Sequence, residues 1–260
     1  SDDKADWNRL MNAIANGISS GEMTKVVSSR EVEFTSETPY NVSSILANLV
    51  DNNPNCFIFG YEKDGRTFVG ASPEILVRHR GSEILSYALA GTAPKDGPNG
   101  WTKEQLLTNT KNIVEHNIVR DRIVNTMKQI TPDVTVGETG IMELSHLYHL
   151  RTIITAKDST KSLVEWAKLL HPTPALGGEP RDKALALLQE YESHERGMYA
   201  APFGFMKDMG DGIVVVAIRS ALIMDNVLYA YAGCGVVADS DADEEYAETN
   251  NKMRTILDAL

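Results

Sequence analysis

The spacing of apolar residues divides the chain into short extended segments and a smaller number of helices. Apolar runs bounded by turn residues predict strands over residues 25–34, 56–61, 67–71, 75–79, 84–89 and 151–156, and a long hairpin of 212–224 with 227–233. A helical period predicts helices over residues 5–18, 42–50, 102–130, 162–170 and 181–192, and a last helix from about residue 240. Many antiparallel strands with segregated helices indicate the α+β class.

The last stretch of the chain carries an unusual arrangement of charges. After the glycine-rich segment Gly233–Val237, the predicted helix places Glu245, Glu248 and Lys252 on one face, next to the apolar face that docks it. Two interpretations stay open. Either this is a solvated first turn with a Glu248–Lys252 ion pair, or the carboxylates require a cation such as Mg²⁺ together with a bound substrate. This stretch alone favours the first.

The glycine-rich segment also matches part of a dinucleotide-binding pattern. That motif needs a following helix, a second strand and a distant acidic residue, and too little chain follows Ala238 to supply them. The nucleotide interpretation is therefore rejected. What remains is that Gly233 and Gly235 allow backbone N–H groups to approach an anion closely.

A second acidic residue lies in the most apolar of the predicted helices. Glu115 has Val114, Ile118 and Val119 as neighbours, so its carboxylate is expected to be buried and to need a partner. Lys111, one helical turn earlier, is the simpler candidate for this partner. A metal ion or a proton is the alternative.

Composition narrows the classes of function. The 260 residues are 42% hydrophobic and 23% charged, as expected for a globular protein of one large or two small domains. The net charge of −11, without any run of basic residues, argues against nucleic acid or an anionic membrane as a partner. Cys56 and Cys234 are isolated, which suggests neither a zinc site nor a disulfide framework and fits a reducing cytoplasm. The chain begins at Ser1, with no signal peptide, so it is expected to be a processed product or an excised piece.

Several motifs together make the chain resemble the chorismate-utilising enzymes, which include isochorismate, salicylate, anthranilate and aminodeoxychorismate synthases. The stretches that carry the resemblance are Lys25–Arg30, Gly70–Glu74, Ala90–Thr92, Glu115-His116, His171–Gly178, Arg196–Gly204, Ile218-Arg219, and Gly233–Val237 with Glu245, Glu248 and Lys252. The resemblance implies one catalytic domain over residues 1–260, with a layered, β-sandwich-like antiparallel core and outer helices. It also implies that the N-terminal segment usual in this family is absent.

The resemblance implies two catalytic residues. Lys25 corresponds to the lysine that activates water, where the ammonia-using anthranilate synthases usually have glutamine. This role depends on a pKa lowered by burial or nearby positive charge. Glu74 corresponds to the general acid that protonates the departing C4 hydroxyl, which requires a carboxyl group held protonated. Without the resemblance, a solvated lysine and an acid at the start of a strand would be the favoured interpretations.

Two alanines separate this chain from other members of the family. Ala90 stands where similar aminodeoxychorismate synthases have a lysine nucleophile, so covalent catalysis at this position is excluded. Ala175 stands where members that eliminate pyruvate tend to have threonine. Both residues favour an isochorismate synthase.

The same resemblance implies a metal site and a substrate site. Glu115 and Glu248 would hold Mg²⁺, with Glu245 close by, because oxygen ligands and an anionic substrate suit this ion. The residues implied to bind chorismate are Gly91, Thr92, His146, Ala175, Tyr199, Arg219, Gly233, Gly235 and Lys252. Arg219 and Tyr199 would take the enolpyruvyl carboxylate. His146 would lie beside the ring, with a half-buried structural histidine as the alternative.

The sequence therefore predicts a cytoplasmic, Mg²⁺-dependent isomerase that converts chorismate to isochorismate, in either menaquinone or siderophore biosynthesis. One alternative is a lyase of the same family that makes salicylate. The other is a non-catalytic chorismate-binding fragment that needs a partner.

Overall fold

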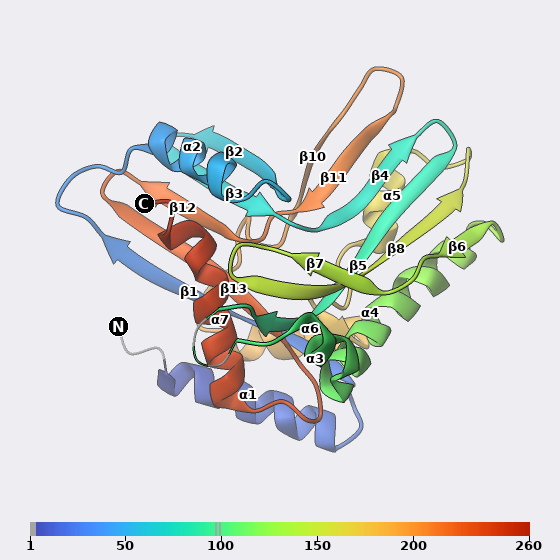
Figure 1. Cartoon of the computed structure of the whole chain (residues 1–260), viewed down its shortest axis with the longest axis horizontal. Coiled ribbons are helices and arrows are strands. Elements are labelled where there is room, and N and C mark those ends of the chain that lie inside the picture. The colour runs from blue at the N-terminus through green and yellow to red at the C-terminus, as the bar shows by residue number, and fades with distance from the viewer. Residues whose placement is uncertain (1–3, 97, 99) are drawn as a thin grey trace.

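The computed structural model describes residues 4–96, 98 and 100–260 and consists of two antiparallel sheets with helices packed around them (Figure 1). The helices are α1 Lys4–Ser19, α2 Val42–Asn52, α3 Lys103–Thr108, α4 Thr110–Lys128, α5 Leu163–Leu170, α6 Arg181–Tyr191 and α7 Ala242–Leu257. The strands are β1 Lys25–Thr35, β2 Phe57–Lys63, β3 Arg66–Ser72, β4 Ile75–Arg80, β5 Glu83–Pro94, β6 Val134–Val136, β7 Gly140–Glu143, β8 Leu147–Lys157, β9 Gly178–Glu179, β10 Pro202–Met206, β11 Gly212–Val216, β12 Ser220–Met224 and β13 Val227–Val236.

The two sheets are built from different parts of the chain. The first has the strand order β2-β3-β12-β13-β1-β9, and the second has the order β10-β11-β4-β5-β8-β6, with β7 also paired to β8. Every strand pairing among the described residues is antiparallel. The predicted α+β class and layered architecture are confirmed.

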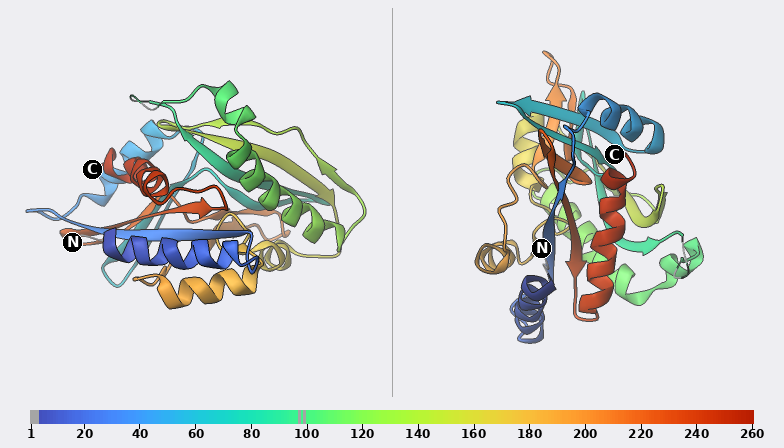
Figure 2. Two further views of the ribbon diagram at one scale, coloured as in Figure 1. Left: turned by 90° about the horizontal axis from the view of Figure 1, so that it is seen from below. Right: turned by 90° about the vertical axis from the view of Figure 1, so that its left-hand side faces the viewer.

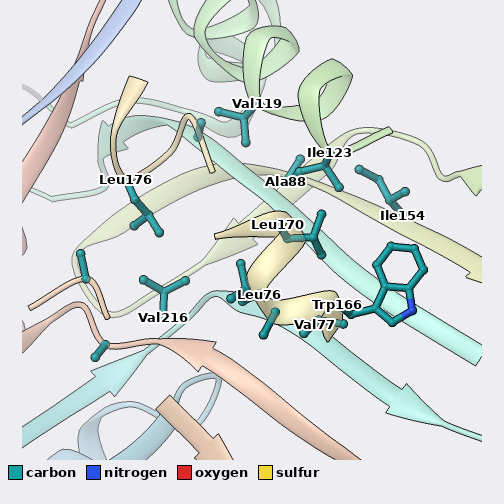
Figure 3. Packing of buried hydrophobic residues seen from close by; sticks show 14 of the residues in the cluster. Leu76, Val77, Ala88, Val119, Ile123, Ile154, Trp166, Leu170, Leu176 and Val216 are labelled. Atoms are coloured by element: carbon teal, nitrogen blue, oxygen red, sulfur yellow. The ribbon is translucent and has the colours of Figure 1, made fainter. Parts of the chain in front are cut away.

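The largest apolar cluster packs α4 and α5 against the second sheet. Figure 3 shows this packing, with Trp166 and Leu170 from α5, Val119 and Ile123 from α4, Leu76 and Val77 from β4, and Ile154 from β8. Burial of these large side chains removes apolar surface from water, which is the main stabilising term in folding. The sheet that carries β4, β5 and β8 is thereby held in place beneath the two helices.

Other helices cover the first sheet. Helices α1 and α6 lie side by side against it (Figure 2), and Trp7, Leu10 and Ile14 pack there with Leu188. Helix α7 packs on β13, and α2 on β2 and β3. The part of the chain that the structure describes contains no helix that is long and apolar enough to span a membrane.

The chain passes from one sheet to the other at two neighbouring points. At Pro73-Glu74 it leaves β3 in the first sheet and enters β4 in the second, and at 217–219 it passes from β11 to β12 in the opposite direction. Ala71 N donates to Arg219 O (3.0 Å), and Val216 N donates to Glu74 O (3.1 Å), so the two crossovers lie against each other. The single strand predicted over residues 212–224 is therefore wrong, because Arg219, at φ 54°, breaks it.

Smaller differences from the prediction have local causes. The helix predicted over residues 102–130 is divided at Asn109, whose side chain accepts from Asn112 N and so starts α4. The strand predicted over 151–156 begins earlier, at Leu147. Strands β6, β7, β9 and β10 were not predicted, and β6, β7 and β9 have no more than four residues each.

Candidate active site

A pocket lies where the two crossovers meet β1, β5, β8 and β13. It contains about 610 Å³ of space free of atoms, its mouth included. Of the predicted site residues, those that line it are Lys25, Glu74, Thr92, Glu115, Ala175, Tyr199, Arg219, Gly233, Gly235 and Lys252. Residues from distant parts of the sequence thus converge on one cavity.

Glu74 has an unusual environment for a carboxyl group. The residue is 2% exposed, and its Oε1 atom is buried without a hydrogen-bond partner. Burial raises the pKa of Glu74 to about 8, although the positive charges of Lys25, Arg219 and Lys252 oppose this shift. The carboxyl group is therefore protonated at neutral pH and able to donate a proton into the pocket.

Arg219 is oriented by a neutral histidine. Its Nη2 atom donates to His149 Nε2 (2.7 Å), and His149 Nδ1 lies 3.0 Å from Thr92 Oγ1. Burial, with Arg219 close by, holds the pKa of His149 well below its ordinary value, so the ring accepts at Nε2 and donates its Nδ1 proton to Thr92. The buried guanidinium keeps its full charge for an anionic ligand.

The structure corrects the prediction for His146. This residue precedes β8 and lies outside the pocket, with its Nε2 atom 2.7 Å from Asp258 Oδ2 and its Nδ1 atom 3.4 Å from Asp96 Oδ2. His149, three residues later, lines the pocket and pairs across the strands with Thr92 of β5. The predicted strand began too late to include His149, and this is why the sequence did not single it out.

Each of the three acidic residues predicted to bind metal has a lysine partner. Lys25 Nζ lies 2.9 Å from Glu115 Oε1, but the two groups are not aligned for a hydrogen bond. Lys111 Nζ pairs with Glu245 Oε1, and Lys252 Nζ lies 2.6 Å from Glu248 Oε1. These six residues are called the lysine–glutamate cluster below. Lys111, the simpler candidate for the partner of Glu115, pairs with Glu245 instead, and Lys25 pairs with Glu115. The Glu248–Lys252 pair exists, but Glu245 beside it is buried rather than solvated.

The charges in the lysine–glutamate cluster set the ionisation of its acids. Burial opposes ionisation of Glu115, but the ammonium groups of Lys25, Lys252 and Lys111 outweigh burial and lower the pKa of Glu115. Burial and the neighbouring Glu248 raise the pKa of Glu245 to about 7, against the effect of Lys111. Glu245 and Glu248 therefore repel each other, although each is paired with a lysine.

Backbone glycines allow this close packing. A Cβ atom at Gly235 would lie 2.1 Å from Glu115 Oε1, and one at Gly233 would lie 2.6 Å from Ser28 O and 2.7 Å from Tyr199 Oη. Gly91 does not line the pocket. Its positive φ of 80° lies at the irregularity in β5 between Leu89 and Thr92, and Thr92 lines the pocket. Lys252 Nζ donates to Gly233 O (2.7 Å). Larger residues at these glycines would displace the groups that line the pocket.

The acidic residues fit a magnesium ion in donor type and charge. Glu115 on α4 and Glu245 and Glu248 on α7 supply only oxygen ligands beside the pocket, as this ion prefers. The repulsion between the α7 carboxylates is the kind that a cation relieves. Among the described residues, no three acidic, histidine or cysteine side chains are gathered closely enough to hold a metal as they stand, because lysines take up the carboxylates.

Known proteins resemble this chain in both sequence and fold. A family model described as chorismate binding enzyme matches residues 1–260. The isochorismate synthase MenF of Bacillus subtilis is 36% identical over 99% of this chain and 56% of its own length. The crystal structure of a putative 2,3-dihydroxybenzoate-specific isochorismate synthase, DhbC, from Bacillus anthracis has a TM-score of 0.93 at 30% identity, over 99% of this chain and 72% of that one.

Sequence identity alone does not separate the activities within this group. Anthranilate synthase component 1 of Arthrobacter globiformis is 34% identical over 92% of this chain and 47% of its own length. The chain thus spans about half the length of each of these two curated relatives. Discrimination between them depends on the residues of the pocket.

Proposed function

The chain belongs to the chorismate-binding enzyme family and is related to isochorismate synthases, and we propose that it converts chorismate reversibly to isochorismate. In this reaction a water molecule adds at C2 of the ring while the C4 hydroxyl leaves as water. One group must accept a proton from the incoming water, and another must donate a proton to the departing hydroxyl.

The observation that carries the proposal is the buried Glu74 carboxyl, whose Oε1 atom has no hydrogen-bond partner, in the same pocket as a buried lysine. Glu74 is the proposed acid, because its proton is retained at neutral pH and its Oε1 atom has no competing partner. Lys25 Nζ is the proposed base. Its action requires the ion pair with Glu115 to open and the Lys25 ammonium group to release a proton to solvent, so that the neutral amine can accept a proton from water.

The remaining groups of the pocket would bind and orient the substrate. Arg219, held by His149, and Tyr199 supply a positive charge and a hydroxyl for the enolpyruvyl carboxylate. Gly235 offers a backbone N–H beside them. Ala90 provides no nucleophile, and Ala175 provides no hydroxyl, which favours hydroxyl exchange over covalent catalysis and over pyruvate elimination.

Magnesium is the proposed cofactor, held by Glu115, Glu245 and Glu248. When bound, it would supply positive charge for the ring carboxylate of chorismate. Lys252, which pairs with Glu248 and lines the pocket, would add its charge to the same side of the substrate.

The test is incubation of the purified chain with chorismate, with and without Mg²⁺, followed by chromatographic separation of the products. Isochorismate that appears only with metal supports the proposal. A fluorescent aromatic product together with pyruvate would favour the salicylate-forming alternative, and the variant Ala175→Thr serves as a reference for that outcome. A chain shown by circular dichroism to be folded, but giving no product, would contradict the proposal and favour a binding role.

A further inference from the structure

Lys111 is the member of the lysine–glutamate cluster to which the proposed reaction gives no role. It lies on α4, one helical turn before Glu115, and its Nζ atom pairs with Glu245 of α7. Burial opposes its charge, but the carboxylates of Glu245, Glu248 and Glu115 outweigh burial and raise the pKa of Lys111. One ammonium group is therefore within electrostatic reach of all three proposed metal ligands.

The other two lysines of the cluster are fixed in the pocket. The side chain of Lys25 is 1% exposed, and that of Lys252 is 12% exposed and also donates to Gly233 O. The Lys111 side chain is 21% exposed and does not line the pocket. Lys111 is thus the lysine that can withdraw toward solvent without disturbing the substrate site.

We propose that Lys111 is a tethered counter-ion that occupies Glu245 in the metal-free protein, and that a divalent cation binds by displacing it. The inference depends on the magnesium site of the proposed function. The three lysines balance the three carboxylates of the cluster, so an added divalent cation would meet a site without net negative charge. Withdrawal of Lys111 removes one of these competing charges and frees an oxygen ligand.

Lys111 also affects the stability of the metal-free protein. Glu245 is 1% exposed, and a buried carboxylate without a partner is strongly destabilising. Lys111 would therefore keep the site intact before metal binds, at the expense of metal affinity. The proposed exchange makes Mg²⁺ binding weaker and more readily reversible than three free carboxylates would allow.

The first test compares Lys111→Met with Lys128→Met, a matched loss of charge at an exposed position at the other end of α4. Calorimetric titration with MgCl₂ should show roughly tenfold tighter binding to Lys111→Met than to the native chain, and native affinity for Lys128→Met. Thermal unfolding should show a lower midpoint for metal-free Lys111→Met and a larger increase on addition of Mg²⁺. Equal or weaker binding to Lys111→Met would overturn the inference.

A second test uses the native chain and so does not depend on the folding of a variant. Lysine amines are acetylated with and without saturating MgCl₂, and the modified sites are measured by mass spectrometry. Magnesium should increase acetylation of Lys111 at least severalfold and leave Lys128 unchanged. Unchanged or reduced acetylation of Lys111, or no binding of Mg²⁺ to the native chain, would overturn the inference, whereas the product assay decides the proposed isomerase activity independently.

Discussion

Two carboxyl groups line the same pocket in opposite states of ionisation. Glu74, at the crossover between the sheets, is 2% exposed, and its pKa is raised to about 8. Glu115, on α4, is 8% exposed, and its pKa is lowered. The two residues are almost equally buried, so burial alone does not explain the difference.

The difference comes from where the chain places its lysines. Lys25 Nζ lies 2.9 Å from Glu115 Oε1, whereas Glu74 Oε1 has no hydrogen-bond partner, and Lys25 acts on Glu74 only through its more distant positive charge. A direct ion pair offsets the cost of burying a charge, and a more distant charge does not. Lys25 thus helps to keep Glu115 ionised, while Glu74 retains its proton at neutral pH.

The largest expected effect comes from removing the proton of Glu74. Glu74→Gln keeps the shape of the protonated side chain but cannot donate a proton, so turnover of chorismate should fall by about 10²–10⁴-fold. The rate of isochorismate formation at saturating chorismate measures this loss. A variant with more than half of the native rate would remove Glu74 from the proposed mechanism.

The next prediction compares how replacing each of the two carboxyl groups changes the stability of the fold. Glu115→Gln leaves Lys25 buried without its partner and should lower the free energy of unfolding by about 3 kcal/mol. Glu74→Gln should instead raise it at pH 7, because the native carboxyl must take up a proton on folding there, whereas the amide does not titrate. Urea unfolding followed by circular dichroism measures both values. Equal losses in the two variants would show that the environments do not differ as described.

A smaller effect concerns the group that orients Arg219. His149→Phe removes the acceptor for Arg219 Nη2, so KM for chorismate should rise about tenfold, with kcat changed less, as expected for loss of a hydrogen bond to a charged group. His146→Gln, outside the pocket, is the matched control and should stay within about twofold of native values in both constants. An equal rise in KM for both variants would contradict the assignment to His149.

The sequence predicted those parts of the fold in which the apolar pattern and the turn residues agree. The hairpins around Gly65 and Gly81 and the last helix are examples. It did not reveal that residues 212–224 divide between two sheets, because apolar residues continue on both sides of Arg219 and only its backbone angle marks the break. The crossovers that build the pocket are tertiary features without a periodic signal.

In the candidate site, too, some features could be predicted from the sequence and others depend on the tertiary structure. Motif resemblance placed Lys25, Glu74 and Arg219 in what proves to be one pocket. The lysine partners of the acids could not be predicted, because Lys111 and Glu245 come from helices far apart in the chain. His149 was missed for a more local reason, since the strand that carries it begins earlier than the apolar pattern indicated.

The ionisation of Glu74 also affects how stability depends on pH. The unfolded chain releases this proton near the ordinary value of 4.5, while the folded chain retains it until about 8. The folded state therefore binds more protons in this window, and the contribution of Glu74 to the free energy of unfolding falls as the pH rises from about 4.5 to about 8. Glu115 has the opposite sign, because its lowered pKa stabilises the fold above its unfolded value and loses that effect in acid.

The most direct test is a carbon-13 NMR titration of the glutamate side-chain carboxyl carbons in the metal-free chain, with Glu74→Gln and Glu115→Gln used to assign the two signals. We expect the Glu74 signal to titrate near pH 8 and the Glu115 signal to remain that of a carboxylate at pH 4.5 and above. Titration of Glu74 near 4.5, together with Glu115, would contradict the claim that this pocket holds one acid ready to donate a proton and another fixed as an anion.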